Sequence, residues 1–224
     1  MTAGPTRKAA RTSRAVPPKT RAGRPKQEDV ARIEARLLSA ALAEFTTHGY
    51  GAASLNRVVR TAGVSKTTLY SRYPSKEQLF RAIMHAEIQR LDAATVLKPD
   101  GRRPALAVGL RAYANHMLAL NLRGDLLAVN RLISSEAHRF PELAAASAER
   151  AELGIKRISA FVQECAVAEG VPCKDPASVA EVFIFMLRGW HANATLTNQK
   201  VSTARREKWV DRAVRTLISA RADW

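Results

Sequence analysis

The chain has 224 residues, of which 36 are Lys or Arg and 20 are Asp or Glu, so its net charge is +16 and its isoelectric point is near 10.7. Such an excess of positive charge predicts a polyanionic partner, although it says nothing about the fold. No stretch approaches the run of about 18 apolar residues that a transmembrane helix needs, so the sequence argues against a membrane-spanning protein.

Residues 1–26 are rich in Ala, Pro, Thr, Arg and Gly and hold few bulky apolar groups. Residues 1–27 contain eight basic residues and no acidic one, so this segment carries half of the net charge. A segment this polar cannot bury enough surface to offset its ordering entropy, so we expect a disordered basic arm. Such an arm either follows DNA phosphates or is a solvated tail. It lacks the apolar stretch of a secretory signal, and we expect a cytoplasmic protein.

A helix is predicted from Gln27 to His48, because apolar residues recur there at every third or fourth position. Gly49-Tyr50-Gly51 follows and is expected to end the helix with a sharp turn. This turn would let the first helix pack across the two short helices that come next. Together with the helix that begins at Lys76, they form a predicted DNA-binding domain over residues 27–88.

Residues 54–73 are predicted to form a helix-turn-helix. Val58, Val59 and Ala62 give the first helix one apolar face. Ser54 is expected to cap its N-terminus, with the hydroxyl accepting from a free N–H of the first turn. Gly63 then stands where a helix end favours a residue that tolerates a positive φ.

Ser65 is expected to cap the second helix, which runs from Lys66 to Tyr73 with Leu69 pointing inward and Pro74 ending it. The remaining side chains of this helix are hydrogen-bond donors, and none is acidic. A short donor-rich helix behind a glycine turn is what reading the major groove requires. An ordinary helical corner with a solvated face is the alternative.

The start of this second helix is expected to reach base edges, with Lys66 donating to guanine and a threonine methyl touching thymine. Tyr70, Arg72 and Lys76 are expected to hold phosphates. The predicted DNA-binding residues are Ser54, Ser65, Lys66, Thr67, Thr68, Tyr70, Ser71, Arg72, Tyr73 and Lys76.

The same region resembles the signature of TetR-type transcriptional regulators over about sixty positions, from Val30 to Glu87. Val59 departs from the pattern, because the family usually has alanine there. The resemblance implies an all-helical dimer with an N-terminal DNA-binding domain and a C-terminal domain that senses a small ligand. It also implies that Lys76 contacts phosphate. The matching residues are Ser54, Val58, Ala62-Gly63-Val64-Ser65, Thr68-Leu69-Tyr70, Tyr73, Ser75-Lys76-Glu77 and Leu79-Phe80.

The resemblance implies that residues 89–224 form a helical ligand-sensing and dimerisation domain. No alternating strand pattern appears, so the predicted fold class is all-α. The segment Ser134 to Leu143 resembles a helix–loop–helix join in one TetR subgroup. The predicted helices cover residues 76–95, 105–122, 125–137, 141–169, a segment that starts at 176, and 203–222.

A ligand pocket is expected between the helices of this domain, lined by apolar groups and a few polar ones. The candidate ligand-binding residues are His116, Met117, Phe161, Met186 and Trp190, each of which is alternatively a core or interface residue. The last two helices carry wide apolar faces, which favour either a four-helix interface between two protomers or packing within one chain.

The sequence therefore predicts a homodimeric transcriptional regulator, most simply a repressor, that binds palindromic double-stranded DNA and a small-molecule effector. A non-specific, architectural basic protein is the alternative, since it would also explain the charge. The five histidines show no metal-ligand spacing, and no nucleophile elbow or phosphate-binding loop is present. We therefore expect no enzymatic activity, no metal and no cofactor.

Overall fold

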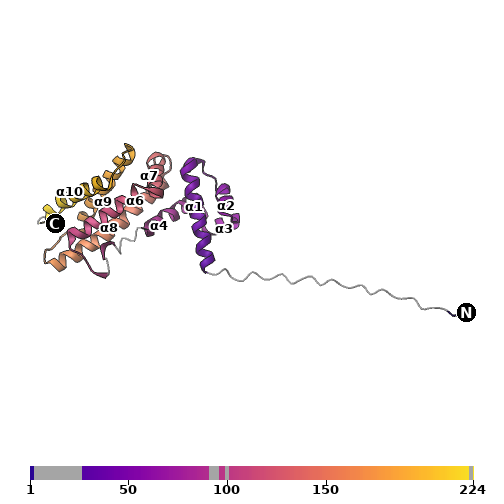
Figure 1. Cartoon of the computed structure of the whole chain (residues 1–224), viewed down its shortest axis with the longest axis horizontal. Coiled ribbons are helices and arrows are strands. Elements are labelled where there is room, and N and C mark those ends of the chain that lie inside the picture. The colour runs from indigo at the N-terminus through magenta and orange to yellow at the C-terminus, as the bar shows by residue number, and fades with distance from the viewer. Residues whose placement is uncertain (3–26, 91–95, 99–100, 222–223) are drawn as a thin grey trace.

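The computed structural model describes residues 1–2, 27–90, 96–98, 101–221 and 224, and the ordered elements among them are all α-helices (Figure 1). The predicted all-α fold is therefore confirmed. Most of the predicted basic arm lies outside the described residues, as do positions 91–95 of the predicted fourth helix. The helices are α1 (Gln27–Ala52), α2 (Leu55–Ala62), α3 (Lys66–Arg72), α4 (Lys76–Arg90), α6 (Leu106–Asn121), α7 (Gly124–Glu136), α8 (Pro141–Glu169), α9 (Pro176–Leu196) and α10 (Thr203–Ser219).

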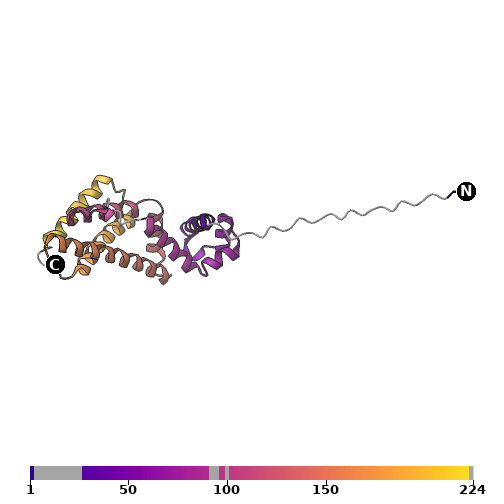
Figure 2. The ribbon, with the colours of Figure 1, turned by 90° about the horizontal axis from the view of Figure 1, so that it is seen from below.

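The helices gather at two ends of an elongated molecule. Helices α1, α2 and α3 lie at one end, α6, α8, α9 and α10 form a bundle at the other, and α4 runs between them (Figures 1 and 2). Helix α7 lies against α1, and α4 lies against α8. The two ends are thus joined by packed helices.

A first apolar core forms around the helix-turn-helix. Phe45, Tyr50 and Phe80 pack ring against ring, with centroids 5.4–5.9 Å apart. Leu69 of α3 is fully buried in the same core. The core also takes in four side chains of α7 and α8, which are Val129, Leu132, Leu143 and Ala146. The helix-turn-helix therefore shares its core with the C-terminal half of the chain.

A second core fills the helical bundle. Tyr113, Phe161 and Phe183 are buried at its centre. Helix α6 passes close to Phe161, because a Cβ added at Gly109 would lie 2.2 Å from the ring. This core holds α6, α8, α9 and α10 together.

Helix α1 breaks at Gly49, as the sequence predicts, where φ is 77° and ψ is 161°. The turn does more than orient α1. The backbone N–H groups of Tyr50 and Gly51 donate to the two carboxylate oxygens of Glu136, at 2.9 and 3.2 Å. Phe140 lies beside Gly51, where an added Cβ would be 2.8 Å from its ring. The Gly49–Gly51 turn therefore contacts the last residue of α7 and the loop that joins α7 to α8.

Candidate DNA interface and buried cavity

The turn between α2 and α3 has the expected glycine geometry. Gly63 adopts a left-handed conformation with φ of 63°, and the Val64 N–H closes the helix end on the Val59 carbonyl at 3.1 Å. The predicted cap by the Ser54 hydroxyl is wrong, because this side chain makes no capping hydrogen bond. The Ser54 N–H instead donates to Glu44 at 2.7 Å. The hydroxyl of Ser54 is thus left for another partner.

Helix α3 is held by a cap at its N-terminus and by two side chains that are buried in the core. The Ser65 hydroxyl accepts from the Thr68 N–H at 3.0 Å, which confirms the predicted cap. Leu69 is fully buried, and Tyr73 is buried with its hydroxyl donating to Glu34 at 3.1 Å. Burial raises the pKa of Tyr73 to about 12, so it stays a neutral donor. Tyr73 therefore supports the helix, and its predicted contact with DNA remains a prediction.

The outer side of α3 is free of acidic groups and faces solvent. Lys66, Thr67 and Ser71 are exposed, and Tyr70 keeps 47% of its surface accessible. Thr68 and Arg72 are half-buried. The four exposed side chains lie on the side of this short helix that faces away from buried Leu69, which is the arrangement that major-groove reading needs.

An ion pair that the sequence did not reveal fixes the start of α2. Glu44 of α1 is buried and accepts from Arg57 Nε at 2.8 Å as well as from the Ser54 backbone. The hydrogen bond from Arg57 lowers the pKa of Glu44 below its usual value. A charge-assisted contact of this kind holds α2, and with it α3, at a set angle to α1.

Lys76 is already engaged by the protein. Its Nζ donates to the carbonyls of Tyr50 and Gly51 at 2.9 and 3.0 Å and lies 5.3 Å from the centre of the Tyr50 ring. An ammonium group has three N–H bonds, so one remains for a phosphate. Lys76 thus joins the start of α4 to the end of α1.

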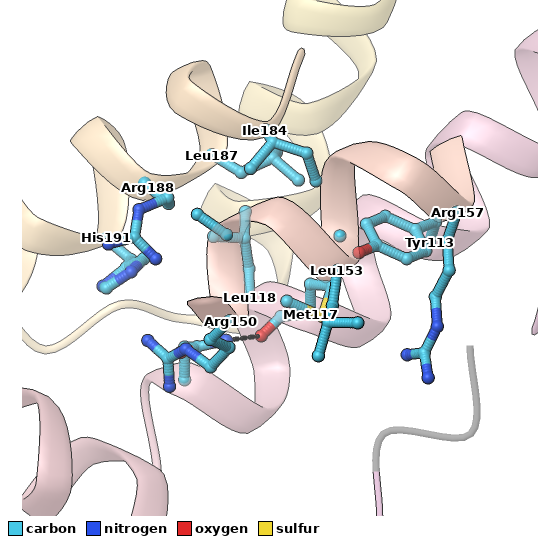
Figure 3. A pocket seen from close by; sticks show the side chains of 13 residues that line it. Tyr113, Met117, Leu118, Arg150, Leu153, Arg157, Ile184, Leu187, Arg188 and His191 are labelled. Atoms are coloured by element: carbon cyan, nitrogen blue, oxygen red, sulfur yellow. Dashed lines mark hydrogen bonds between the residues drawn. The ribbon is translucent and has the colours of Figure 1, made fainter. Parts of the chain in front are cut away.

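A narrow cavity lies between α6, α8 and α9 in the second bundle (Figure 3). Its free volume is about 40 Å³, which is room for only a few water molecules. Its apolar walls include Tyr113, Met117, Leu118, Leu153, Ile184 and Leu187.

Three basic side chains, Arg150, Arg188 and His191, gather at one end of this cavity (Figure 3). Arg150 donates to the Asn130 side chain at 2.8 Å, and Arg188 donates to the Ser147 hydroxyl at 2.9 Å. The same three residues line a second cavity on the side of α7. They therefore form a polar wall between an apolar and a more polar compartment.

Comparison with known proteins identifies both halves of the chain. Residues 37–83 match the model described as bacterial regulatory proteins, tetR family. Residues 108–220, about half of the chain, match the C-terminal domain of AefR-like transcriptional repressors. The protein belongs to the TetR family. It is a DNA-binding transcriptional regulator of the helix-turn-helix class, as the signature in residues 54–80 indicated.

Named relatives and solved structures agree with this assignment. The transcriptional repressor KstR of Mycolicibacterium smegmatis is 32% identical over 82% of this TetR-family chain and 85% of its own. The repressor SCO4008 of Streptomyces coelicolor is 31% identical, over 32% of this chain and 38% of its own length. A TetR-family regulator of Mesorhizobium loti superposes with a TM-score of 0.71 at 26% identity, covering 85% and 96% of the two chains. The flavonoid-responsive regulator FrrA gives 0.66 at 28% identity over 85% and 97%.

Only Met117 of the five predicted ligand-binding residues lines the cavity between α6, α8 and α9. Phe161 is core, and Trp190 stacks on Trp209 with ring centroids 4.8 Å apart. Met186 lines a separate groove between α9 and α10. His116 is half-buried, and its Nε2 has no partner among the described residues. Whether these residues bind a ligand remains a prediction.

TetR-family regulators are generally non-enzymatic DNA-binding proteins. In the described part of this chain, no three His, Cys, Asp or Glu side chains come together as a metal site would need. No helix in that part is long and apolar enough to cross a membrane.

Proposed function

We propose that this TetR-family regulator represses transcription as a homodimer, that it binds a palindromic operator, and that a small ligand changes its affinity for DNA. In this proposal residues 27–88 read DNA, and residues 89–224 bind the ligand and form the dimer. The names of KstR and SCO4008 as repressors support repression. The name of FrrA, which is flavonoid-responsive, supports control by a small molecule. Because its proposed ligand is an operator, the protein acts in the cytoplasm.

The donor-rich outer side of α3 is the observation that carries DNA reading. Lys66 and Thr67 lie in its first turn, which is the part of a recognition helix that reaches base edges. Ser54, Tyr70, Arg72 and Lys76 are proposed to hold phosphates, with Ser65, Thr68 and Ser71 beside them. Two such helices in a dimer would lie about 34–36 Å apart, so the operator is an inverted repeat.

One face of α9 supports dimerisation. Val182 and Phe185 are 52% and 50% exposed, and Gly189 follows on the same helical face with open space beside it. The wide apolar faces of the last two predicted helices mostly pack within the chain, since Phe183, Val210 and Val214 are fully buried. The proposed interface is therefore the outer face of α9. Phe185→Glu should convert the dimer to a monomer in analytical ultracentrifugation, and an unchanged mass would refute this interface.

A chain of contacts through α7 supports ligand control. Arg150 at the cavity donates to Asn130 on α7, and Glu136 at the end of α7 holds the Tyr50 and Gly51 N–H groups of the reading head. A ligand that shifts α7 would therefore change the orientation of α1 and of α3. Its effect is limited by the difference in its affinity for the two arrangements.

Selection of binding sites from random duplex DNA tests the proposal. The variants Lys66→Ala and Tyr70→Ala alter the reading face, and Lys156→Ala is the matched control, because it removes one exposed positive charge from α8. We expect an inverted repeat to be recovered by the parent protein and by Lys156→Ala, and to be lost with the two α3 variants.

The outcome separates this proposal from the architectural alternative. Recovery of no motif, with equal DNA binding by all variants, would show that the net charge of +16 acts without sequence reading. Salt dependence does not distinguish the two, because phosphate contacts give both a steep dependence. The ratio of specific to non-specific affinity does.

A further inference from the structure

Arg150 of α8 is a buried cation with unused hydrogen-bonding capacity. Only 7% of its surface is exposed. One guanidinium nitrogen, Nη2, donates to Asn130 at 2.8 Å, whereas Nη1 is buried and has no partner among the described residues. A buried donor that makes no hydrogen bond is costly, and a buried charge more so.

No negative charge compensates Arg150 within its own cavities. None of the described residues that line the two cavities is acidic, and a second cation, Arg188, lines both of them. Burial, and to a smaller extent the charge of Arg188, lowers the pKa of Arg150 to about 10. The guanidinium is still charged at neutral pH, so this site carries a net positive charge inside the bundle.

Two further buried polar atoms also have no hydrogen-bond partner in the part of the chain that the structure describes. They are Nδ1 of His191 and the hydroxyl of Thr195, which, like Arg150, line the second cavity. Burial lowers the pKa of His191 to about 4, so its ring is neutral at pH 7. The Arg150 Nη1 carries two N–H groups and Thr195 carries one O–H, so unused donors face this cavity, and a carboxylate has two acceptor oxygens for donors of this kind.

The other side of the same wall is apolar. Met117 and Leu118 of α6, Leu153 of α8, and Ile184 and Leu187 of α9 line the first cavity. Pockets of this kind hold the apolar body of a ligand, while a few placed polar groups fix its head. The cavity is narrow as it stands, so a ligand would have to widen it by separating helices.

We propose that the effector is an amphipathic carboxylate, whose carboxylate accepts from Arg150 and whose apolar body lies between α6 and α9. This inference rests on the proposed ligand control and names the chemical class of the ligand. The carboxylate supplies the missing counter-charge and accepts from the free N–H groups of Arg150 Nη1. Its arrival changes the bond from Arg150 to Asn130, which is the first link to α7.

Isothermal calorimetry on the full-length protein, without DNA, tests this class directly. The probes are decanoate and 3-phenylpropanoate, each paired with the neutral alcohol of the same skeleton, together with decyl phosphate. A charge-assisted hydrogen bond should make at least one carboxylate bind about tenfold or more tightly than its alcohol. Equal affinity for acid and alcohol, tighter binding of decyl phosphate, or no binding of either acid would overturn the proposal.

Variants locate the anion. Arg150→Met should remove the preference for acid over alcohol, and Thr195→Val should reduce it. Lys156→Met, which removes an exposed charge from the same helix, should preserve the preference. Equal loss in the Lys156 variant would point to the general positive field and overturn the assignment to Arg150. If Arg150→Met fails to fold, as judged by circular dichroism, Arg150→Lys and Thr195→Val decide the question.

This readout is independent of DNA. Carboxylate binding without a selected operator would refute the proposed repressor function and leave the anion site intact. If the protein binds a selected operator tightly but does not bind carboxylates, the anion site is refuted and the proposed repressor function stands.

Discussion

Replacement of Glu136 tests whether α7 holds the reading head. Its carboxylate accepts from the Tyr50 N–H at 2.9 Å in a partly buried position and from the Gly51 N–H at 3.2 Å in an exposed one. A hydrogen bond to a charged group contributes about 1.5–3 kcal/mol, and an exposed donor recovers most of this from water. We therefore expect Glu136→Ala to lower the free energy of unfolding by about 2 kcal/mol, and Glu136→Gln by about 1 kcal/mol because the amide keeps one acceptor.

Urea denaturation followed by circular dichroism measures the effect. Glu152→Gln is the matched control, because Glu152 is an exposed carboxylate on α8. Affinity for the selected operator should fall with Glu136→Ala, since the Gly49–Gly51 turn is then free to change its angle to α7. Wild-type stability in Glu136→Ala, or an equal loss in the control, would refute the idea that this carboxylate joins the two halves.

Three further predictions concern single residues. Gly63→Ala should destabilise the protein by about 1 kcal/mol in urea denaturation, because φ of 63° strains an L-residue although the nearest atom, Arg36 Nη1, is 3.7 Å from the new Cβ. The lowered pKa of His191 means that its contribution to the free energy of unfolding is complete above pH 6.5 and declines as the pH falls from 6.5 to about 4. Urea denaturation at several pH values in this range should show that the free energy of unfolding falls with falling pH, and that it falls less in His191→Phe. Glu44 has a lowered pKa, so its contribution is present above pH 4.5 and is lost at lower pH. Glu44→Gln should lose less stability than the wild type on acidification below pH 4.5.

The helix-turn-helix was predictable because its signals are local. Gly63 requires a positive φ, and Ser65 caps the helix that starts one residue later, so both features are set within a few residues. The Ser54 cap failed for a long-range reason. Its backbone N–H is taken by Glu44, ten residues earlier on α1, and no pattern in the sequence indicates that this glutamate is buried.

The cavity was mostly unpredictable, because its lining depends on how distant helices pack. The sequence selected Met117, which lines the cavity. It also selected Phe161, which is buried in the second core and does not line the cavity. Arg150 and Arg188 look like ordinary charges on amphipathic helices. Only the packing of α7 and α9 against α8 shows that Arg150 is enclosed.

The stack of Trp190 on Trp209 has a practical consequence. It places two of the three tryptophans of the chain ring to ring across α9 and α10, with centroids 4.8 Å apart. Trp190 is next in sequence to His191 of the polar wall and one position beyond Gly189 of the proposed dimer face. The protein therefore carries its own optical reporter, whose fluorescence and exciton-coupled circular dichroism are set by the register of these two helices. Ligand entry and subunit exchange can both be followed on the unmodified chain.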